Sequence, residues 1–162
     1  MKKLFFMMFL LAFLFCSCAN EQNILSYQES NIIANCTINE KFNVNITKNG
    51  DYLSLEVLSP ATLCGIMFEM TSKGAYAIKD EIKIPLDKDS LRGILALLNS
   101  FSLSEDAMTT VSLDNIISFD TDYGLYTVTY GENNLPQNIK ILSDAYEYNI
   151  IVNTIKLTKA TE

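Results

Sequence analysis

The stretch Phe42-Asn43-Val44-Asn45-Ile46-Thr47-Lys48-Asn49-Gly50-Asp51-Tyr52-Leu53-Ser54-Leu55-Glu56-Val57 decides the fold. Apolar and polar residues alternate on both sides of Asn49-Gly50. This dipeptide is typical of a two-residue β-hairpin turn, because a type I′ turn needs positive φ at both central positions. Such a turn predicts these cross-strand pairs: Ile46 with Leu53, Val44 with Leu55, Phe42 with Val57, Asn45 with Ser54, and Asn43 with Glu56. The sequence therefore predicts a hairpin with one apolar and one polar face.

Further strand patterns follow this hairpin. Ser59-Pro60 ends its second strand, because proline has no N–H group to donate to a sheet. Segments that alternate in polarity, or that are rich in Val, Ile, Thr and Tyr, predict strands at residues 63–70, 75–78, 82–86, 111–119, 125–130, 138–142 and 146–157. Short turns separate them, among them residues 71–74 and the hairpin loop at residues 131–136. Consecutive strands joined by short turns predict an antiparallel sheet.

One helix interrupts the strands. It is predicted by an apolar stripe with the spacing i, i+3, i+4, i+7 and i+10, which consists of Leu91, Ile94, Leu95, Leu98 and Phe101. Asp87 or Asp89 is expected to cap its first turn, because a carboxylate accepts hydrogen bonds from free backbone N–H groups. Gly93 costs about 1 kcal/mol relative to Ala inside a helix. Either a neighbour packs closely against Gly93 or the helix is marginal.

The order of elements, strands, then one helix, then strands, predicts an α+β fold that is mainly β. We expect an antiparallel sheet that one or two helices cover on one face, because an amphipathic helix must bury its apolar stripe. No internal repeat or low-complexity segment divides the chain. Residues 31–162 are therefore expected to form a single β-rich domain.

The first residues have the pattern of an export signal. Met1-Lys2-Lys3 precedes an apolar run at residues 4–15, which is shorter than the roughly 20 residues needed to cross a bilayer. Ser17-Cys18 resembles the site at which a bacterial lipoprotein is cleaved and its cysteine receives a diacylglycerol. We expect residues 1–17 to be the signal peptide, Cys18 to be lipidated and residues 18–30 to form a spacer. The alternatives are an ordinary signal peptide cleaved elsewhere and an uncleaved anchor.

This signal places the protein outside the cytoplasm, anchored to the cell membrane or envelope through the N-terminal diacylglycerol. Two acyl chains make a lasting tether, whereas one chain binds only marginally. The whole chain has 12 basic and 19 acidic residues, a net charge of −7, and loss of Lys2 and Lys3 changes it to −9. A domain with this net negative charge is not expected to bind nucleic acid, because binding to phosphates requires basic side chains.

The chain contains no histidine. This removes the commonest general base, the commonest metal ligand and the usual partner of a Ser or Cys nucleophile. We therefore expect a protein that is not an enzyme and that carries no cofactor and no metal. An enzyme that works through carboxylates alone remains as a third hypothesis. Its candidate groups include Asp114, Asp120 and Asp122, which we interpret as an acidic turn rather than a calcium loop because the bidentate Glu is missing.

Two further groups of residues leave alternatives open. Cys36 and Cys64, the cysteines outside the export signal, form either a disulfide or two buried thiols. Five tyrosines gather in the C-terminal half and either line a pocket or a partner-binding face, or occupy ordinary strand positions. They are Tyr123, Tyr126, Tyr130, Tyr146 and Tyr148.

The layout resembles the LolA/LolB-like lipoprotein-carrier superfamily. The resemblance rests on Leu58-Ser59-Pro60-Ala61-Thr62-Leu63-Cys64-Gly65-Ile66-Met67-Phe68 and on the Gly…Leu-Pro hairpin at residues 131–136, together with the signal, the first hairpin and the mid-chain helix. It implies a strongly curved half-barrel whose concave face, covered by helices, holds acyl chains or another apolar ligand. Small lipoproteins of this kind can instead be partners of other envelope proteins. Two features depart from the pattern: the carrier is soluble whereas this chain is expected to be anchored, and no arginine is placed to gate a cavity.

Two functional hypotheses follow. In the first, an anchored half-barrel binds an apolar ligand, such as an acyl chain, or an envelope protein. In the second, a structural or regulatory envelope lipoprotein binds a protein partner and has no ligand cavity. The helix stripe Leu91, Ile94, Leu95, Leu98 and Phe101 is the candidate ligand-binding surface in the first hypothesis and plain core in the second. An apolar cavity of a few hundred Å³ between sheet and helix would favour the first.

Overall fold

The computed structural model of this protein describes residues 26–87, 91–111 and 115–158. The strands are β1 (Asn31–Ile38), β2 (Phe42–Asn49), β3 (Tyr52–Ser59), β4 (Met67–Thr71), β5 (Gly74–Lys79), β6 (Ile82–Leu86), β7 (Met108–Val111), β8 (Ile116–Thr121), β9 (Gly124–Tyr130), β10 (Pro136–Leu142) and β11 (Glu147–Thr158). The helices are α2 (Arg92–Leu98) and three 3₁₀ helices, η1 (Ser26–Glu29), η2 (Asn99–Phe101) and η3 (Glu105–Ala107).

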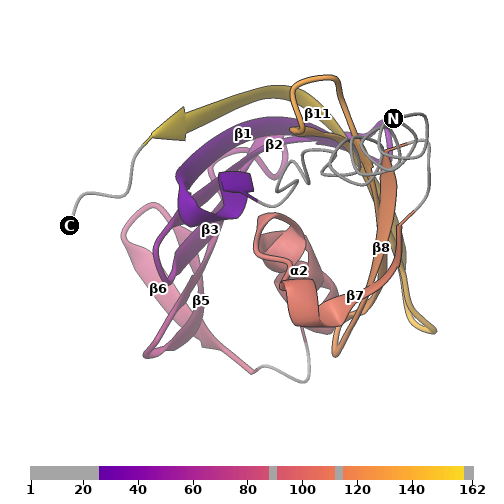
Figure 1. Ribbon diagram of the computed structural model, residues 1–162. Helices are drawn as coiled ribbons and strands as arrows, with labels where there is room; N and C mark the ends of the chain where they lie inside the picture. The colour runs from indigo at the N-terminus through magenta and orange to yellow at the C-terminus, as the bar shows by residue number, and fades with distance from the viewer. Residues whose placement is uncertain (1–25, 88–90, 112–114, 159–162) are drawn as a thin grey trace, which may run out of the picture.

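All the described strands belong to one antiparallel sheet of eleven strands in the order β6-β5-β4-β3-β2-β1-β11-β10-β9-β8-β7. Each strand pairs with its neighbour in sequence, except that β1 and β11 pair in the middle and join the two halves. The sheet curves into a half-barrel whose free edges are β6 and β7, and α2 lies inside the curve (Figure 1). The expected fold, a curved antiparallel sheet with a helix on one face, is confirmed.

The predicted hairpin forms between β2 and β3, but its turn lies one residue later than expected. Gly50 and Asp51 occupy the centre, and Asn49 pairs with Tyr52. Of the two central residues only Gly50 has a positive φ, 56°. This is the φ pattern of a type II′ turn, whose first central residue is typically Gly, rather than of the type I′ turn that Asn-Gly favours.

The later turn displaces all five predicted pairs, which were wrong. The observed pairs include Val44 with Val57, Ile46 with Leu55, Asn45 with Glu56 and Asn43 with Ser59, whereas Phe42 lies outside the pairing with β3. From Val44 to Asn49 the displacement is by two positions, so no side chain changes face, and a register shift lies between Asn43 and Val44. The apolar face is therefore as predicted, and its residues Val44, Ile46, Leu53, Leu55 and Val57 are buried.

The strand β1 was missed in the sequence, although it lies near the centre of the sheet. Its burial alternates, with Ile32, Ala34, Cys36 and Ile38 buried and the residues between them more exposed. This is the alternation of a strand with one face on the core. The expected spacer ends at residue 30, and no strand is predicted between it and the hairpin that begins at Phe42.

Two other predicted strands differ from the structure. The strand expected at residues 63–70 begins only at Met67, because residues 60–65 form a turn in which Gly65 has φ of 81° and donates its N–H to the Val57 carbonyl oxygen at 2.9 Å. The strand expected at residues 111–119 is divided into the antiparallel pair β7 and β8. Asn115, with φ of 56°, directly precedes β8, and Asn tolerates this left-handed conformation better than most residues.

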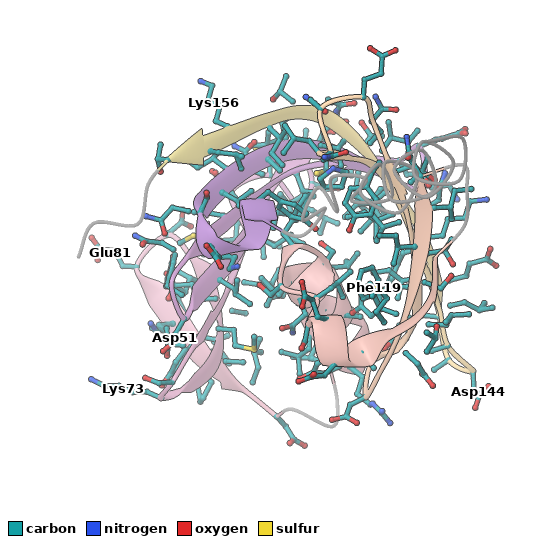
Figure 2. All side chains as sticks on the ribbon, in the orientation of Figure 1. Asp51, Lys73, Glu81, Phe119, Asp144 and Lys156 are labelled. Carbon is teal, nitrogen blue, oxygen red and sulfur yellow. The ribbon has the colours of Figure 1, made fainter. Side chains whose placement is uncertain are left out.

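The concave face of the sheet packs against α2 and η2. Leu95, Ala96, Leu97, Leu98 and Phe101 are all buried, so the helical segment is covered on more than the predicted stripe. Figure 2 shows Phe119 of β8 pointing towards this helix, whereas Asp144 and Lys156 point away from the molecule. One polar contact also joins sheet and helix, since the buried Tyr126 hydroxyl donates to the Ala96 carbonyl oxygen at 2.9 Å. A satisfied buried hydroxyl of this kind fixes the position of the helix.

The helix does not begin as predicted. Leu91 occupies the N-cap position and makes no side-chain capping hydrogen bond. Asp87 is therefore not the N-cap residue of α2, and Asp89 lies outside the described residues. Of the two alternatives at Gly93, the close neighbour is present, because a Cβ built there would lie 2.5 Å from the Tyr148 hydroxyl oxygen.

The folded part of the chain starts earlier than the expected boundary at residue 31. The 3₁₀ helix η1 brings Tyr27, which is 3% exposed, into the core. Its ring centroid lies 6.2 Å from that of Tyr130. Residues 26–30 are therefore part of the fold rather than spacer, because an aromatic side chain gains more by burial than by remaining in water.

The two described cysteines are free. Cys36 is buried on the concave face and pairs with Val44 and Val152, whereas Cys64 is exposed in the turn at residues 60–65. The disulfide is therefore not formed, and the alternative of two buried thiols is right for Cys36 only. Burial raises the pKa of the Cys36 thiol to about 12.

Alkylation is expected to distinguish the two thiols. Treated with iodoacetamide at neutral pH, Cys64 should be modified rapidly and Cys36 should remain unmodified, because the thiolate is the reactive form and needs access to the reagent. Peptide mass spectrometry of the full chain separates these sites from Cys16 and Cys18. In guanidinium chloride both should react, and fast modification of Cys36 in the native protein would contradict the placement of β1.

Candidate functional site

A cavity of about 250 Å³ lies between the sheet and α2, and we call it the apolar pocket. Its sheet wall is formed by Val44 of β2, Leu55 and Val57 of β3 and Phe68 of β4. Its helix wall is formed by Ile94 and Leu97. Apart from Asn39 and Tyr148, every side chain that lines it is a hydrocarbon. A pocket of this composition accommodates an apolar group and offers few hydrogen bonds to a polar one.

The register of the strands produces the sheet wall. Ile46, Leu55, Phe68, Ala77 and Ile84 are successive cross-strand partners from β2 to β6 and therefore share the concave face. This row starts under the helix, passes through the pocket at Leu55 and Phe68, and ends at Ile84, which is 55% exposed. Leu63, which is 38% exposed, lines the pocket from the turn at residues 60–65 and marks where it opens to solvent.

The structure brings only part of the predicted ligand-binding stripe to this pocket. Ile94 lines it, whereas Leu95, Leu98 and Phe101 are buried in the core and Leu91 lies at the helix N-cap, outside the pocket. Leu97, which the stripe did not include, lines the pocket as well. The difference arises because the helix is enclosed by a curved sheet, so that two of its faces meet strands instead of one.

The C-terminal tyrosines fall into two groups. Tyr126 and Tyr130 are core residues, and burial raises the pKa of each phenol well above its ordinary value. Tyr146 and Tyr148 stack with ring centroids 5.3 Å apart, next to Gly93 at the start of α2. Of the five tyrosines only Tyr148 lines the apolar pocket.

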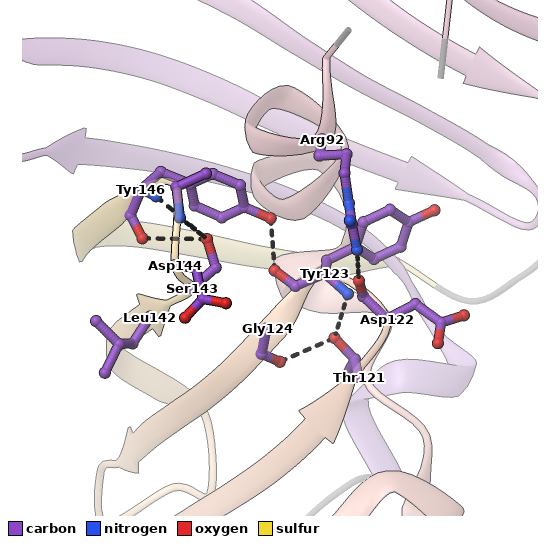
Figure 3. A pocket seen from close by; sticks show the side chains of 10 residues that line it. Arg92, Thr121, Asp122, Tyr123, Gly124, Leu142, Ser143, Asp144 and Tyr146 are labelled. Atoms are coloured by element: carbon purple, nitrogen blue, oxygen red, sulfur yellow. Dashed lines mark hydrogen bonds between the residues drawn. The ribbon is translucent and has the colours of Figure 1, made fainter. Parts of the chain in front are cut away.

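On the other side of this stacked pair is a second hollow of about 360 Å³, which we call the polar notch. It lies between the start of α2 and the turns that precede β9 and β11, and Arg92, Asp122, Tyr123, Asp144 and Tyr146 line it (Figure 3). The Tyr146 hydroxyl donates to the Tyr123 carbonyl oxygen at 2.5 Å. Arg92 donates to the Asp122 carbonyl oxygen.

Arg92, the single arginine of the chain, is the residue that reasoning from the sequence overlooked. It was not placed at a cavity, because its position at the first turn of a helix gives no sign of what faces it. Only the packing of α2 against Tyr146 and Tyr148 places its side chain at the polar notch.

The remaining predicted groups do not form a further site. Asp120 and Asp122 are exposed near the β8–β9 turn, as expected for an acidic turn, and Asp114 lies outside the described residues. The described residues contain no group of three or more Cys, Asp or Glu side chains that could hold a metal ion. Within residues 26–87, 91–111 and 115–158, no helix is long and apolar enough to cross a membrane. The signal peptide and the lipidation site Cys18 lie outside the described part of the chain.

Fold and pocket together define the class of protein: an open, helix-filled antiparallel half-barrel with an apolar pocket under the helix. Comparisons with known proteins agree with this at the level of the fold. No protein-family model matches the sequence, and no curated protein sequence matches it. Among solved structures, an uncharacterized conserved protein from Thermus thermophilus is similar with a TM-score of 0.50, 13% identity, and coverage of 86% of this chain and 88% of that one.

A LolA superfamily protein from Nitrosomonas europaea is also similar, with a TM-score of 0.38, 11% identity, and coverage of 85% of this chain and 93% of that one. LolA is the superfamily that the sequence resembles. The likeness to the Thermus thermophilus protein shows a shared fold. Membership of the superfamily stays a prediction.

Proposed function

We propose that this protein is a membrane-anchored lipoprotein of the cell envelope that binds an apolar chain, such as an acyl chain, in the apolar pocket and catalyses no reaction. The observation that carries the proposal is the pocket itself, a cavity of about 250 Å³ lined almost entirely by hydrocarbon side chains between the sheet and α2. A fully packed interior would have favoured a protein with no ligand. The anchor rests on the sequence pattern around Cys18.

The size of the pocket sets the length of chain that it accepts. At ~30 Å³ per methylene, close to the volume of a water molecule in the liquid, the pocket holds about eight carbons. Burying eight methylenes contributes on the order of 6 kcal/mol. The lost freedom of the ligand offsets part of this, so we expect a Kd above the roughly tens of micromolar that burial alone would give. A medium-length chain such as decanoate is therefore a suitable probe.

A tryptophan at the rim of the pocket would report binding. All described elements lie within residues 26–158 and enclose one core, so a chain that starts at Ala19 retains the whole fold and needs no detergent. The protein has no Trp, so Leu63→Trp introduces a single reporter. Decanoate is expected to shift its emission to the blue and to saturate. The same substitution at Leu125, which is 40% exposed on the convex face, should report no binding.

A charge in the pocket is expected to abolish this signal. Ile94→Asp places a carboxylate against the ligand and should weaken decanoate binding at least about tenfold, since a buried unpaired charge is costly. Leu91→Asp makes the same change in charge on the same helix but outside the pocket. It should leave binding unaltered, because an N-cap carboxylate accepts from free backbone N–H groups. Equal loss in both variants, or no saturable signal in the parent, would disprove the proposal.

A second candidate, binding of a protein partner at the free edge of the sheet, is favoured by one observation. Ile82 and Ile84 of β6 are 65% and 55% exposed, and β6 has a neighbouring strand on one side only. Exposed apolar side chains on an unpaired edge are typical of a surface that accepts another chain. The decanoate titration distinguishes ligand binding in the apolar pocket from binding at the β6 edge. Ile84→Asp should leave decanoate binding unchanged if the apolar pocket is the site.

A further inference from the structure

Two hollows of opposite character flank the first turn of α2. Arg92 faces the polar notch, and Ile94, two residues further along the helix, faces the apolar pocket. Gly93 lies between them. The two hollows therefore lie on different sides of the first turn of α2, and the side chains that pack on Gly93 lie between them.

The stacked pair of Tyr146 and Tyr148 forms the division. Tyr148 lines the apolar pocket and Tyr146 lines the polar notch. The Tyr148 hydroxyl occupies the space that a side chain at position 93 would take, because a Cβ there would lie 2.5 Å from the hydroxyl oxygen. The stacked pair therefore borders a hydrocarbon surface on the Tyr148 side and a polar surface on the Tyr146 side.

The polar notch contains a guanidinium whose N–H donors are used only in part by the described residues. Arg92 is exposed and donates to the Asp122 carbonyl oxygen, and among the described residues it forms no ion pair. A guanidinium has five N–H donors, so this bond orients the group and leaves others available. In Figure 3 the Asp122 side chain points away from the guanidinium, and Asp144 lies on the opposite side of the notch. A fork of N–H donors suits the oxygens of a carboxylate or phosphate.

We propose that the ligand is an amphiphile whose alkyl chain occupies the apolar pocket and whose oxyanion headgroup, a carboxylate or a phosphate, binds to Arg92 in the polar notch. This inference rests on the proposed function, since the alkyl chain occupies the same pocket. It adds the chemistry of the headgroup and assigns its recognition to one residue. The volume of the notch, about 360 Å³, leaves room for either group.

Three probes with the same ten-carbon chain test the headgroup: decanoate, decyl phosphate and decanol, each titrated into the Leu63→Trp variant of the chain from Ala19. The two oxyanions should bind about tenfold more tightly than decanol, the advantage expected of one or two charge-assisted hydrogen bonds. The advantage should shrink as the salt concentration rises, because the site is open to solvent. The first two probes distinguish a carboxylate from a phosphate headgroup.

Arg92→Gln is expected to remove the advantage of the oxyanions and to leave decanol binding unchanged, and Arg92→Lys should restore part of it. Lys140→Gln removes the same charge from an exposed site on β10 and serves as the matched control. Thermal unfolding followed by circular dichroism verifies that each variant is folded. Equal affinity for all three probes, or an equal effect of Lys140→Gln, would overturn the headgroup assignment while leaving the proposed function intact. If decanol does not bind either, both proposals fail.

Discussion

Phe101→Ala is expected to lower the free energy of unfolding by about 3–5 kcal/mol. Phe101 is 0% exposed and ends the helical segment that fills the half-barrel. Its removal leaves a cavity between that segment and the sheet, where surrounding side chains collapse only in part. Since a domain of this size has about 5–15 kcal/mol of stability in total, the loss is a large fraction of what holds the fold together.

Urea unfolding of the chain from Ala19, followed by circular dichroism, measures this change. Leu125→Ala is the control, because Leu125 is 40% exposed on β9 and its truncation should cost less than about 0.5 kcal/mol. Phe101→Ala should also weaken decanoate binding, since α2 carries Ile94 and Leu97 to the pocket. If the two substitutions have equal effects on stability, the helical segment is not packed into the sheet as described.

Gly124→Ala is the second substitution with a large expected effect. Gly124 has a φ of 125°, a conformation that costs a residue with a side chain about 1–3 kcal/mol. A Cβ at this position would also lie 2.5 Å from the Leu142 carbonyl oxygen. That atom is backbone in β10 and cannot rotate aside, so β9 and β10 would have to separate. The loss of unfolding free energy should therefore exceed the strain alone.

Gly50→Ala is the matched control for this effect. Gly50 also has a positive φ, 56°, and also lies in a hairpin turn, but nothing is within 4 Å of the Cβ that would be added. Its substitution should cost about 1–2 kcal/mol, the strain of the left-handed conformation. Urea unfolding of both variants gives the comparison. A smaller loss at Gly124 than at Gly50 would show that the approach of Leu142 is not as close as described.

Reasoning from the sequence succeeded where the pattern is local. The alternation around Asn49-Gly50 predicted which residues of β2 and β3 face the core, and the spacing from Leu91 to Phe101 predicted the helix. The turn was predicted one residue too early. Asn49-Gly50 and Gly50-Asp51 both permit a two-residue turn, and the choice between them depends on how the two strands pair along their length. The buried face was nevertheless predicted correctly, because a displacement by two positions leaves each side chain on the same face of the sheet.

The candidate site was predicted less well than the fold. The helix stripe predicted one residue of the apolar pocket, Ile94, but missed Leu97 and the residues contributed by β2, β3 and β4. A stripe drawn on an isolated helix assumes one buried face, whereas a curved sheet encloses the helix from several directions. Arg92 was overlooked because its neighbours in the polar notch come from residues 121–124 and 142–146, which are far from it in sequence.

By itself, the sequence determined the absence of histidine, the strongly acidic charge, and the apolar faces of the β2–β3 hairpin and the helix, and the export signal stays a prediction from it. These depend on composition or on residues close together in the chain. The tertiary structure alone decided that Cys36 and Cys64 are apart, that Tyr27 belongs to the core, and that the concave face leaves a pocket. A pocket is the space that remains after the curvature of eleven strands and the position of one helix are set together. No periodicity in one segment encodes that space.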